Sequence, residues 1–309
     1  MTTYFFDRTP HSGVLELTDQ HRLDLLHRMS TNDVNVLQSG EGCSTVLTTA
    51  LARIIDRVTV YHRGETVLLL TALPDAVRAW LQKHIFWADK VKVRDVSASW
   101  AHVELYGAQA AALIGEIVPG AETLPLHHNR ESGGLLAAPT YLLAGAGYRL
   151  LIPQETADDL RTRLVNDSRI TLGNSETYER LRIAAGMPAA GHELTEDYIP
   201  LEAGLWESVS FRKGCYIGQE IIARMESRNK LAKTLVALQL TEYAPLKATI
   251  AHDGMAVGTL TSLAQMEDGT YRGLGFVKPE WSASGTRLTL ENVPVEVVPA
   301  PLIAPRETV

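Results

Sequence analysis

The sequence predicts an α+β fold with two related ferredoxin-like α+β subdomains and a C-terminal antiparallel β-barrel. Three observations predict it. The first is a β-hairpin at 57–72, followed by a helix with one apolar face at 74–86. The second is that this pattern recurs, since a hairpin at 134–153 precedes a helix at 154–167. The two copies align at an offset of 79 residues, which indicates a structural pseudo-repeat.

The third observation concerns the last quarter of the chain. Beyond about residue 230 the helical periodicity disappears, and short strand-like runs alternate with Gly, Pro and Asp, as is typical of a small β-barrel. The preceding segment, 219–228, has the apolar spacing of a helix. We therefore predict a region of two pseudo-repeated subdomains at 1–229 and a barrel at 230–309.

The remaining elements follow in chain order. A helix is expected within 17–29, and it should end at Ser30 or Thr31. The runs at 90–97 and 100–107 have the composition of strands, and 108–118 is a plausible helix. These segments connect the two copies of the pseudo-repeat.

Composition excludes several classes of protein. The 309 residues are 45% hydrophobic and 21% charged, which is ordinary for a globular protein of two or three packed units. The formal net charge of −7 provides no overall basic field, so direct nucleic-acid binding is not expected. No apolar run reaches the roughly 18 residues of a membrane span, and the N-terminus does not resemble a secretion signal. We expect a cytoplasmic protein that does not bind membranes.

Cysteine and histidine usage argues against a metal site within one chain. Cys43 and Cys215 are the two cysteines, and a secreted protein of this size would usually contain more. They have no partners at the spacing of zinc or cluster ligands. His127 and His128 lie in a predicted loop, again without such partners, and are expected to be solvated.

The segment KGCYIGQE, residues 213–220, places a cysteine on a tight loop that leads into a helix. Gly214 and Gly218 permit backbone conformations or close approaches that a side chain would block. The positive end of the helix and the charge of Lys213 would both favour the thiolate of Cys215. The alternative is a small buried cysteine with no reactivity.

Residues 178–224, which include this segment, resemble the signature stretch of the folate-binding superfamily that contains the glycine-cleavage T-protein. The KGCY-x-GQE pattern is similar to the YgfZ-type branch, which covers bacterial YgfZ and a related mitochondrial iron–sulfur assembly factor. Segments MSTNDVNVL, VGTLTS and YRGLGFV also resemble the superfamily. The resemblance therefore covers nearly the whole chain.

The resemblance implies a ring of two α+β subdomains and a barrel, with tetrahydrofolate as the cofactor in a central opening. In the T-protein-like enzymes, folate accepts a one-carbon unit from an aminomethyl group, aided by an Asp-Asp pair and by a glutamate in an RLEAG segment. Here Asp56 stands without a second aspartate, and Ala184 occupies the glutamate position. Both departures weaken the transferase interpretation, since an alanine cannot accept hydrogen bonds from a pterin.

In the YgfZ-type branch, the motif cysteine and bound folate are associated with the assembly or repair of iron–sulfur proteins, and indirectly with tRNA modification. The resemblance thus implies Cys215 as the reactive group, iron–sulfur proteins or their assembly factors as partners, and no metal site of the protein's own. Lys213 is the second candidate catalytic residue. The other residues that shape the loop are Gly214, Tyr216, Gly218, Gln219 and Glu220.

Four side chains are candidates for polar contacts with folate. Arg182, Arg212 and Lys213 are possible cations for its glutamate tail, and Lys233 occupies a basic position common in the family. Simple solvation at the surface explains each of them almost equally well.

Glu202 is a candidate acceptor for pterin N–H groups, with local capping as its alternative. Asp56 is a candidate neighbour of the reactive folate nitrogen, and its alternative is a surface ion pair with Arg57. Trp206 and Tyr216 are candidates for stacking on the pterin, but an aromatic side chain more often packs in the core.

The leading hypothesis is a folate-binding accessory protein of iron–sulfur cluster assembly with a reactive Cys215. One alternative is a tetrahydrofolate-dependent aminomethyltransferase or demethylase. The other is a scaffold that does not bind folate.

Overall fold

A computed structural model describes residues 2–228, 230–291 and 293–303. The chain divides into two compact units. The first contains the chain up to Gly173 together with Glu207–Gln219. The second contains Asn174–Trp206 together with the chain from Glu220 onward.

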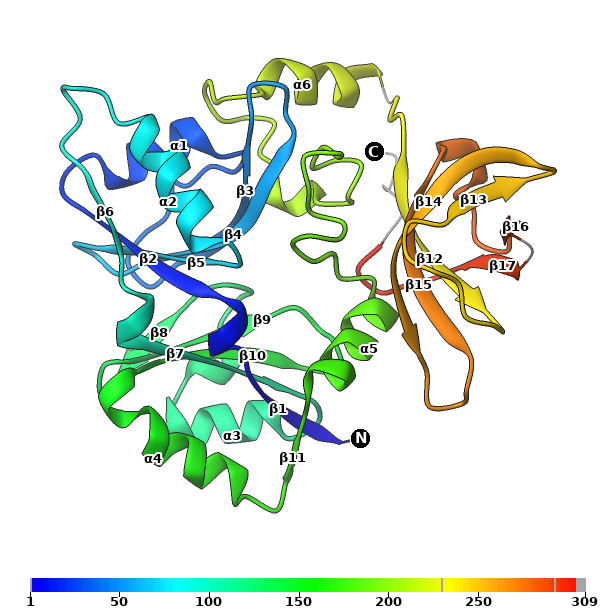
Figure 1. Ribbon diagram of the computed structural model, residues 1–309. Coiled ribbons are helices and arrows are strands. Elements are labelled where there is room, and N and C mark those ends of the chain that lie inside the picture. Colours follow the sequence, from blue (N-terminus) through cyan, green and yellow to red (C-terminus); the bar gives the residue numbers. More distant parts are fainter. Residues whose placement is uncertain (1, 229, 292, 304–309) are drawn as a thin grey trace. The chain divides into compact units, whose positions relative to one another are not determined.

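The first unit contains two β-sheets (Figure 1). The six-stranded sheet has the order β11-β1-β7-β10-β9-β8, and its pairs are antiparallel except β1 with β11. Its strands are β1 (Thr3–Asp7), β7 (Trp100–Tyr106), β8 (Arg130–Ser132), β9 (Leu135–Thr140), β10 (Gly147–Pro153) and β11 (Ile170–Leu172). The antiparallel five-stranded sheet has the order β3-β4-β5-β2-β6. Its strands are β2 (Gly13–Thr18), β3 (Gly42–Thr48), β4 (Ile54–His62), β5 (Val67–Thr71) and β6 (Lys92–Asp95).

Helices cover the outer faces of both sheets (Figure 1). Helices α1 (Arg22–Met29) and α2 (Pro74–Lys83) pack on the five-stranded sheet, and α3 (Ala110–Ile117) and α4 (Gln154–Val165) pack on the six-stranded one. Apolar side chains on the inner faces join the sheets to each other. They are Val14, Tyr61, Leu68, Leu70, Leu136, Ala138 and Leu151. The side-chain alternation of strands explains this arrangement, since Val14 faces the other sheet while Leu15 faces the helices.

The predicted pseudo-repeat is confirmed. The β4–β5 hairpin precedes α2, and the β9–β10 hairpin precedes α4. Helix α1 ends at Met29 with Ser30 as its C-cap, as predicted. Short 3-10 helices lie at Thr9–His11, Ser97–Ser99, Ala121–Thr123, Trp206–Ser208 and Pro279–Trp281.

The second unit contains a closed six-stranded barrel and helix α5 (Ser175–Ala185). The barrel order is β12-β15-β14-β13-β16-β17, and β17 pairs with β12 to close it. Its strands are β12 (Thr234–Leu240), β13 (Thr249–His252), β14 (Met255–Gln265), β15 (Tyr271–Val277), β16 (Arg287–Leu290) and β17 (Val293–Val298). Helix α6 (Gln219–Arg228) begins at the last residue of the first unit. The predicted α+β class and the antiparallel barrel are therefore confirmed. Within the described ranges, no helix is long and apolar enough to cross a membrane.

Candidate functional site

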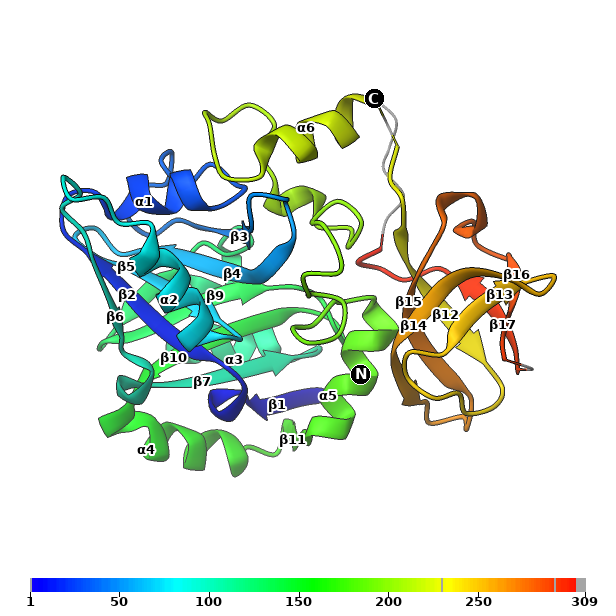
Figure 2. The ribbon, with the colours of Figure 1, turned by 45° about the horizontal axis from the view of Figure 1, so that its top comes forward.

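The motif cysteine lies at the surface. Cys215 is exposed on the loop that precedes α6, which begins at Gln219. Figure 2 shows α6 and the loop before it. Cys43 is partly buried in β3, and burial raises the pKa of its thiol to about 12. Of the two thiols, that of Cys215 is therefore the more accessible to a partner molecule.

Lys213 holds this loop against the end of α1. Its buried ammonium donates hydrogen bonds to three backbone carbonyl oxygens, those of His27 at 2.6 Å, Ser30 at 2.8 Å and Asn32 at 2.7 Å. The same Nζ lies 4.9 Å from the ring centroid of Tyr216, within the range of a cation–π contact. Burial lowers the pKa of Lys213 to about 8. The three N–H donors of the ammonium are all used in these bonds, so the geometry gives Lys213 a structural role. Stabilisation of the Cys215 thiolate by Lys213 stays a prediction.

The two motif glycines differ in what the backbone requires of them. Gly218 has a φ of +83°, and a Cβ there would lie 2.9 Å from the carbonyl oxygen of Thr49. Gly214 has no positive φ, and its nearest contact would be the imidazole Nε2 of His27 at 3.8 Å. Only Gly218 is therefore needed for the backbone conformation and the close approach to the β3–β4 turn.

Polar contacts that were not predicted from the sequence fix the segment before the motif. Thr31 Oγ1 donates a hydrogen bond of 2.6 Å to the carbonyl oxygen of Ser208, and the N–H of Ser210 donates one of 2.9 Å to the carbonyl oxygen of Thr31. The hydroxyls of Ser44 and Ser208 lie 2.8 Å apart and are buried. The residues before Lys213 are thus attached to the MSTNDVNVL segment and to β3. Their chemistry is ordinary, so only the fold identifies them.

Asp56 is buried in β4. It therefore does not lie at the surface, as the alternative of a surface ion pair with Arg57 required. Its Oδ2 accepts hydrogen bonds from Thr71 Oγ1 at 2.5 Å and from the N–H of Ala72 at 3.0 Å. Its Oδ1 is buried with no hydrogen-bond partner among the described residues, and burial raises the pKa of the carboxyl. Asp56 faces the helix-covered side of the sheet, as Val58 and Val60 do along the same strand, while the next residue, Arg57, lies over the ring of Tyr141 just after β9. Ile217 of the motif packs against the core on that same side.

A second group of polar side chains, which was not predicted from the sequence, lies between the two sheets. Arg149 Nε donates a 2.7 Å hydrogen bond to Glu104, which is fully buried, and Tyr106 donates another to the same carboxylate at 2.9 Å. Beside them, His127 is 4% exposed and packs edge-on against Tyr141. The prediction that His127 is solvated is wrong, because the fold buries its ring against Tyr141. Both imidazole nitrogens and the Tyr141 hydroxyl lack hydrogen-bond partners among the described residues.

In the second unit, Arg182 belongs to a buried network. Its guanidinium forms ion pairs with Glu179 at 2.5 Å and Glu193 at 3.3 Å, and it donates a 2.9 Å hydrogen bond to Ser262 of β14. Glu193 is fully buried and also accepts hydrogen bonds from Thr261 and Ser262, each at 2.6 Å. This network joins α5 to the barrel, so the guanidinium of Arg182 is already occupied.

The other predicted folate contacts of the second unit lie close to the barrel. Glu202 is buried and accepts a hydrogen bond from the N–H of Ile199 at 3.2 Å. This contact corresponds to the local capping that was the alternative to pterin binding. Lys233 is exposed, and its Nζ lies 5.0 Å from the ring centroid of Tyr198. Tyr198 in turn stacks on Phe276 at 3.5 Å.

The remaining predicted residues are placed as follows. Trp206 is half-buried at the start of a 3-10 helix, and Tyr216 is buried, with a pKa that burial raises to about 12. Arg212 and Glu220 are exposed, and Gln219 is the first residue of α6. The first unit therefore brings the motif residues together on one loop beside α1 and places Asp56 on the same face of the sheet. No group of three or more His, Cys, Asp or Glu side chains in the described ranges could hold a metal ion.

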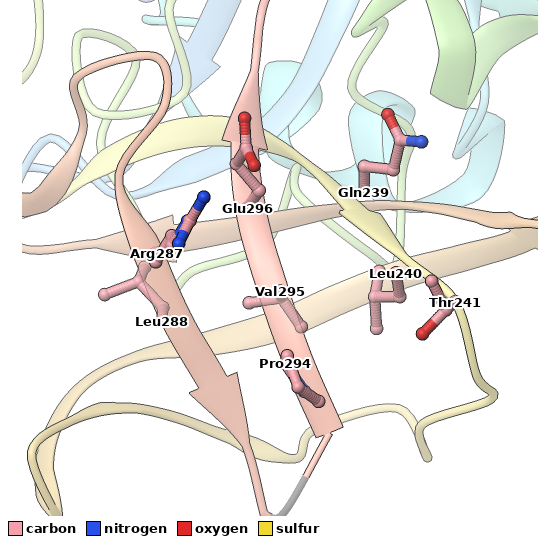
Figure 3. A pocket seen from close by; sticks show the side chains of 8 residues that line it. All are labelled: Gln239, Leu240, Thr241, Arg287, Leu288, Pro294, Val295 and Glu296. Atoms are coloured by element: carbon pink, nitrogen blue, oxygen red, sulfur yellow. The ribbon is translucent and has the colours of Figure 1, made fainter.

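The barrel has a groove of about 330 Å³ that no predicted site residue lines (Figure 3). Polar side chains from three neighbouring strands, Gln239, Glu296 and Arg287, lie above apolar ones such as Val295. The groove thus lies apart from the motif loop in sequence and belongs to the second unit.

Comparison with known proteins shows to which family the chain belongs. A family model described as "GCVT N-terminal domain" matches residues 6–213. The chain belongs to this family. A protein of Arabidopsis thaliana described as "Putative transferase At1g60990, chloroplastic" is 30% identical over 304 residues, covering 95% of this chain and 70% of the relative.

Members of the GCVT family with a named activity are also similar. The aminomethyltransferase of Halalkalibacterium halodurans is 27% identical over 296 residues, covering 90% of this chain and 80% of that protein. The crystal structure of the glycine cleavage system aminomethyltransferase T from Bartonella henselae superimposes with a TM-score of 0.86. At 20% identity it covers 97% of this chain and 86% of the other, and it shows that the fold is shared. The predicted aminomethyltransferase-like superfamily is thus confirmed, while the YgfZ-type branch stays a prediction.

Proposed function

We propose that this GCVT-family protein is a folate-binding accessory protein of the YgfZ type, which supports the assembly or repair of iron–sulfur proteins through Cys215. The observation that carries the proposal is the exposed thiol on a loop that Lys213 and Gly218 fix on either side. An accessible thiol can bind iron transiently or exchange with a disulfide, whereas a buried one cannot. The cytoplasmic location and the indirect link to tRNA modification stay predictions.

Several side chains fit tetrahydrofolate as the cofactor. The Oδ1 of Asp56 is a buried acceptor without a partner among the described residues, and pterin N–H groups are matching donors. Arg212, which is exposed in the first unit, is a cation that complements the carboxylates of the folate tail, and Lys233 of the second unit stays a predicted contact. Arg182 fits this role poorly because its guanidinium is bound to Glu179 and Glu193. When bound, folate would supply one-carbon chemistry.

The test is a pair of cysteine variants in cells that lack the protein. Cys215→Ala should fold and bind tetrahydrofolate like the wild type but should not restore the activity of iron–sulfur enzymes. Cys43→Ala is the matched control, because its thiol lies within β3, and it should restore that activity. Full restoration by Cys215→Ala would refute the role of the thiol.

A second candidate is a tetrahydrofolate-dependent aminomethyltransferase or demethylase. Asp56 on β4 and the relatives named aminomethyltransferase favour it, whereas Ala184 at the glutamate position does not. It predicts that the purified protein forms methylene-tetrahydrofolate from an aminomethyl donor under saturating folate. The third candidate, a scaffold without folate, predicts no heat of binding when tetrahydrofolate is titrated into the protein.

A further inference from the structure

An exposed pair of aromatic side chains lies in the first unit, on the loop 84–91 between α2 and β6, which we call the aromatic loop. Trp87 is 99% exposed and Phe86 is 62% exposed. Water contact with so much aromatic surface is unfavourable, and exposed Trp and Phe are typical of the centres of protein interfaces. This surface is therefore a candidate for covering by a partner.

The aromatic loop is held in shape before any partner binds. The N–H of Phe86 donates a 2.8 Å hydrogen bond to Asp89, and the N–H of Asp89 donates one of 2.9 Å to the carbonyl oxygen of Phe86. The guanidinium of Arg28 lies 5.0 Å from the Phe86 ring centroid and also bonds Asp89 at 2.8 Å. Because these contacts are already made, a partner would not have to order the loop on binding.

The charge around the loop indicates an acidic partner. Lys83 and Lys90 flank the aromatic pair, are exposed, and form no ion pair among the described residues. The nearby carboxylates of Asp24 and Asp89 are both bonded to Arg28. The chain as a whole has a net charge of −7, so these two exposed cations form a locally positive surface on an acidic chain.

The same residue, Arg28, connects the aromatic loop to the thiol loop. Its side chain contacts Phe86, and its carbonyl oxygen accepts a 3.1 Å hydrogen bond from the N–H of Ile217, two residues after Cys215. Figures 1 and 2 both show the loop before α6 beside α1, where α2 also ends. A protein that covers Phe86 and Trp87 would therefore have its surface next to Cys215.

We propose that the aromatic loop docks an acidic iron–sulfur protein and brings it to the face of the first unit that contains Cys215. The proposal rests on the proposed function, because it takes its class of partner from there. Trp87 and Phe86 supply the apolar contact, and Lys83 and Lys90 select for acidic surfaces.

The test uses the full chain and an acidic [2Fe–2S] ferredoxin as the probe, labelled for fluorescence anisotropy at two salt concentrations. The wild type should bind in a salt-dependent way. Trp87→Ser and the double variant Lys83→Glu/Lys90→Glu should each weaken binding at least tenfold. Met255→Ser is the control for loss of an exposed apolar side chain, because Met255 in the barrel is 62% exposed, as Phe86 is. This variant should bind like the wild type. All the exchanged side chains are exposed, so circular dichroism should show an unchanged fold.

Four outcomes would overturn the proposal. In the first, the wild type does not bind ferredoxin, and in the second, Trp87→Ser leaves the binding unchanged. In the third, the chain associates with itself through Trp87. In the fourth, it binds phosphatidylcholine–phosphatidylserine vesicles through Trp87. The last two would assign the loop to a second copy of the chain or to a membrane. Docking is separable from the proposed function: Cys215→Ala should bind ferredoxin normally. If Cys215→Ala restores enzyme activity while docking persists, only the proposed function fails.

Discussion

The ammonium of Lys213 lies 2.8 Å from the carbonyl oxygen of Ser30, so the first residue of the motif closes the end of α1. A helix ends with unpaired carbonyl groups, and here a lysine 183 residues away in sequence from Ser30 binds the carbonyl oxygens of both His27 and Ser30. The motif lysine therefore stabilises the position of the cysteine loop in addition to any effect on the thiol.

Replacing this lysine should detach the loop. Lys213→Met leaves three carbonyl acceptors without their shared donor, and we expect unfolding free energy to fall by about 2–3 kcal/mol. The measurement is urea denaturation, with Lys278→Met as the control because Lys278 is exposed. Alkylation of Cys215 by iodoacetamide should also change in rate, since the loop loses its anchor. A stability equal to that of the control would contradict the structural role.

The two motif glycines offer a matched pair. Gly218→Ala places a Cβ 2.9 Å from the Thr49 carbonyl oxygen in a left-handed conformation, and we expect a loss of about 1–3 kcal/mol. Gly214→Ala meets nothing closer than 3.8 Å, and it should change stability by less than about 0.5 kcal/mol. Thermal unfolding of both variants measures the difference. Equal effects would show that the loop adjusts freely around Gly218.

The elements with a clear period were the ones that the sequence predicted well. Helix α6 was expected at 219–228, as observed, and strands β12 and β15 lie in the strand-rich region expected beyond residue 230. Their boundaries are set by local signals, namely apolar spacing within the element and Gly or Pro at its ends. The short strand β11 was not predicted, because its three residues are recognisable as a strand only through pairing with β1.

The site was predicted only in part, for a related reason. The exposure of Cys215 agrees with the hypothesis of a reactive thiol, which the motif suggested. The sequence could not show that Lys213 is buried against α1 or that Arg182 is paired with Glu193, since those contacts join segments far apart in the chain. It also failed for His127, whose polar type suggests solvent but whose loop is covered by the fold.

The network around Arg182 should be essential for the stability of the second unit. Arg182→Met leaves the fully buried Glu193 without its cation, and breaking a buried pair in this way costs about 3–5 kcal/mol. Arg180→Met is the control, because its partner Glu267 is 77% exposed, and it should cost less than about 1 kcal/mol. Chemical denaturation followed by circular dichroism measures both. If Arg182→Met is as stable as the control and instead loses folate affinity, the cation serves the ligand rather than the fold.

The buried His127 should make the first unit sensitive to acid. Burial, followed by the charges of Arg149, Arg57 and His128, lowers the pKa of His127 to about 3. In the unfolded chain a histidine has a pKa of about 6.5, so between these two values the unfolded state binds the proton and the folded state does not. Stability is therefore lost as pH falls through this window, by about 2 kcal/mol from pH 7 to pH 5.

His127→Asn should remove that part of the pH dependence, and asparagine tolerates the left-handed φ of 65° at this position. Urea midpoints at pH 7 and pH 5 should differ less for this variant than for the wild type. His11→Asn, at an exposed position, should keep the wild-type difference. An unchanged difference in His127→Asn would mean that the imidazole is protonated in the folded protein, and that one of its unpaired nitrogens has found an acceptor such as a bound water or ligand.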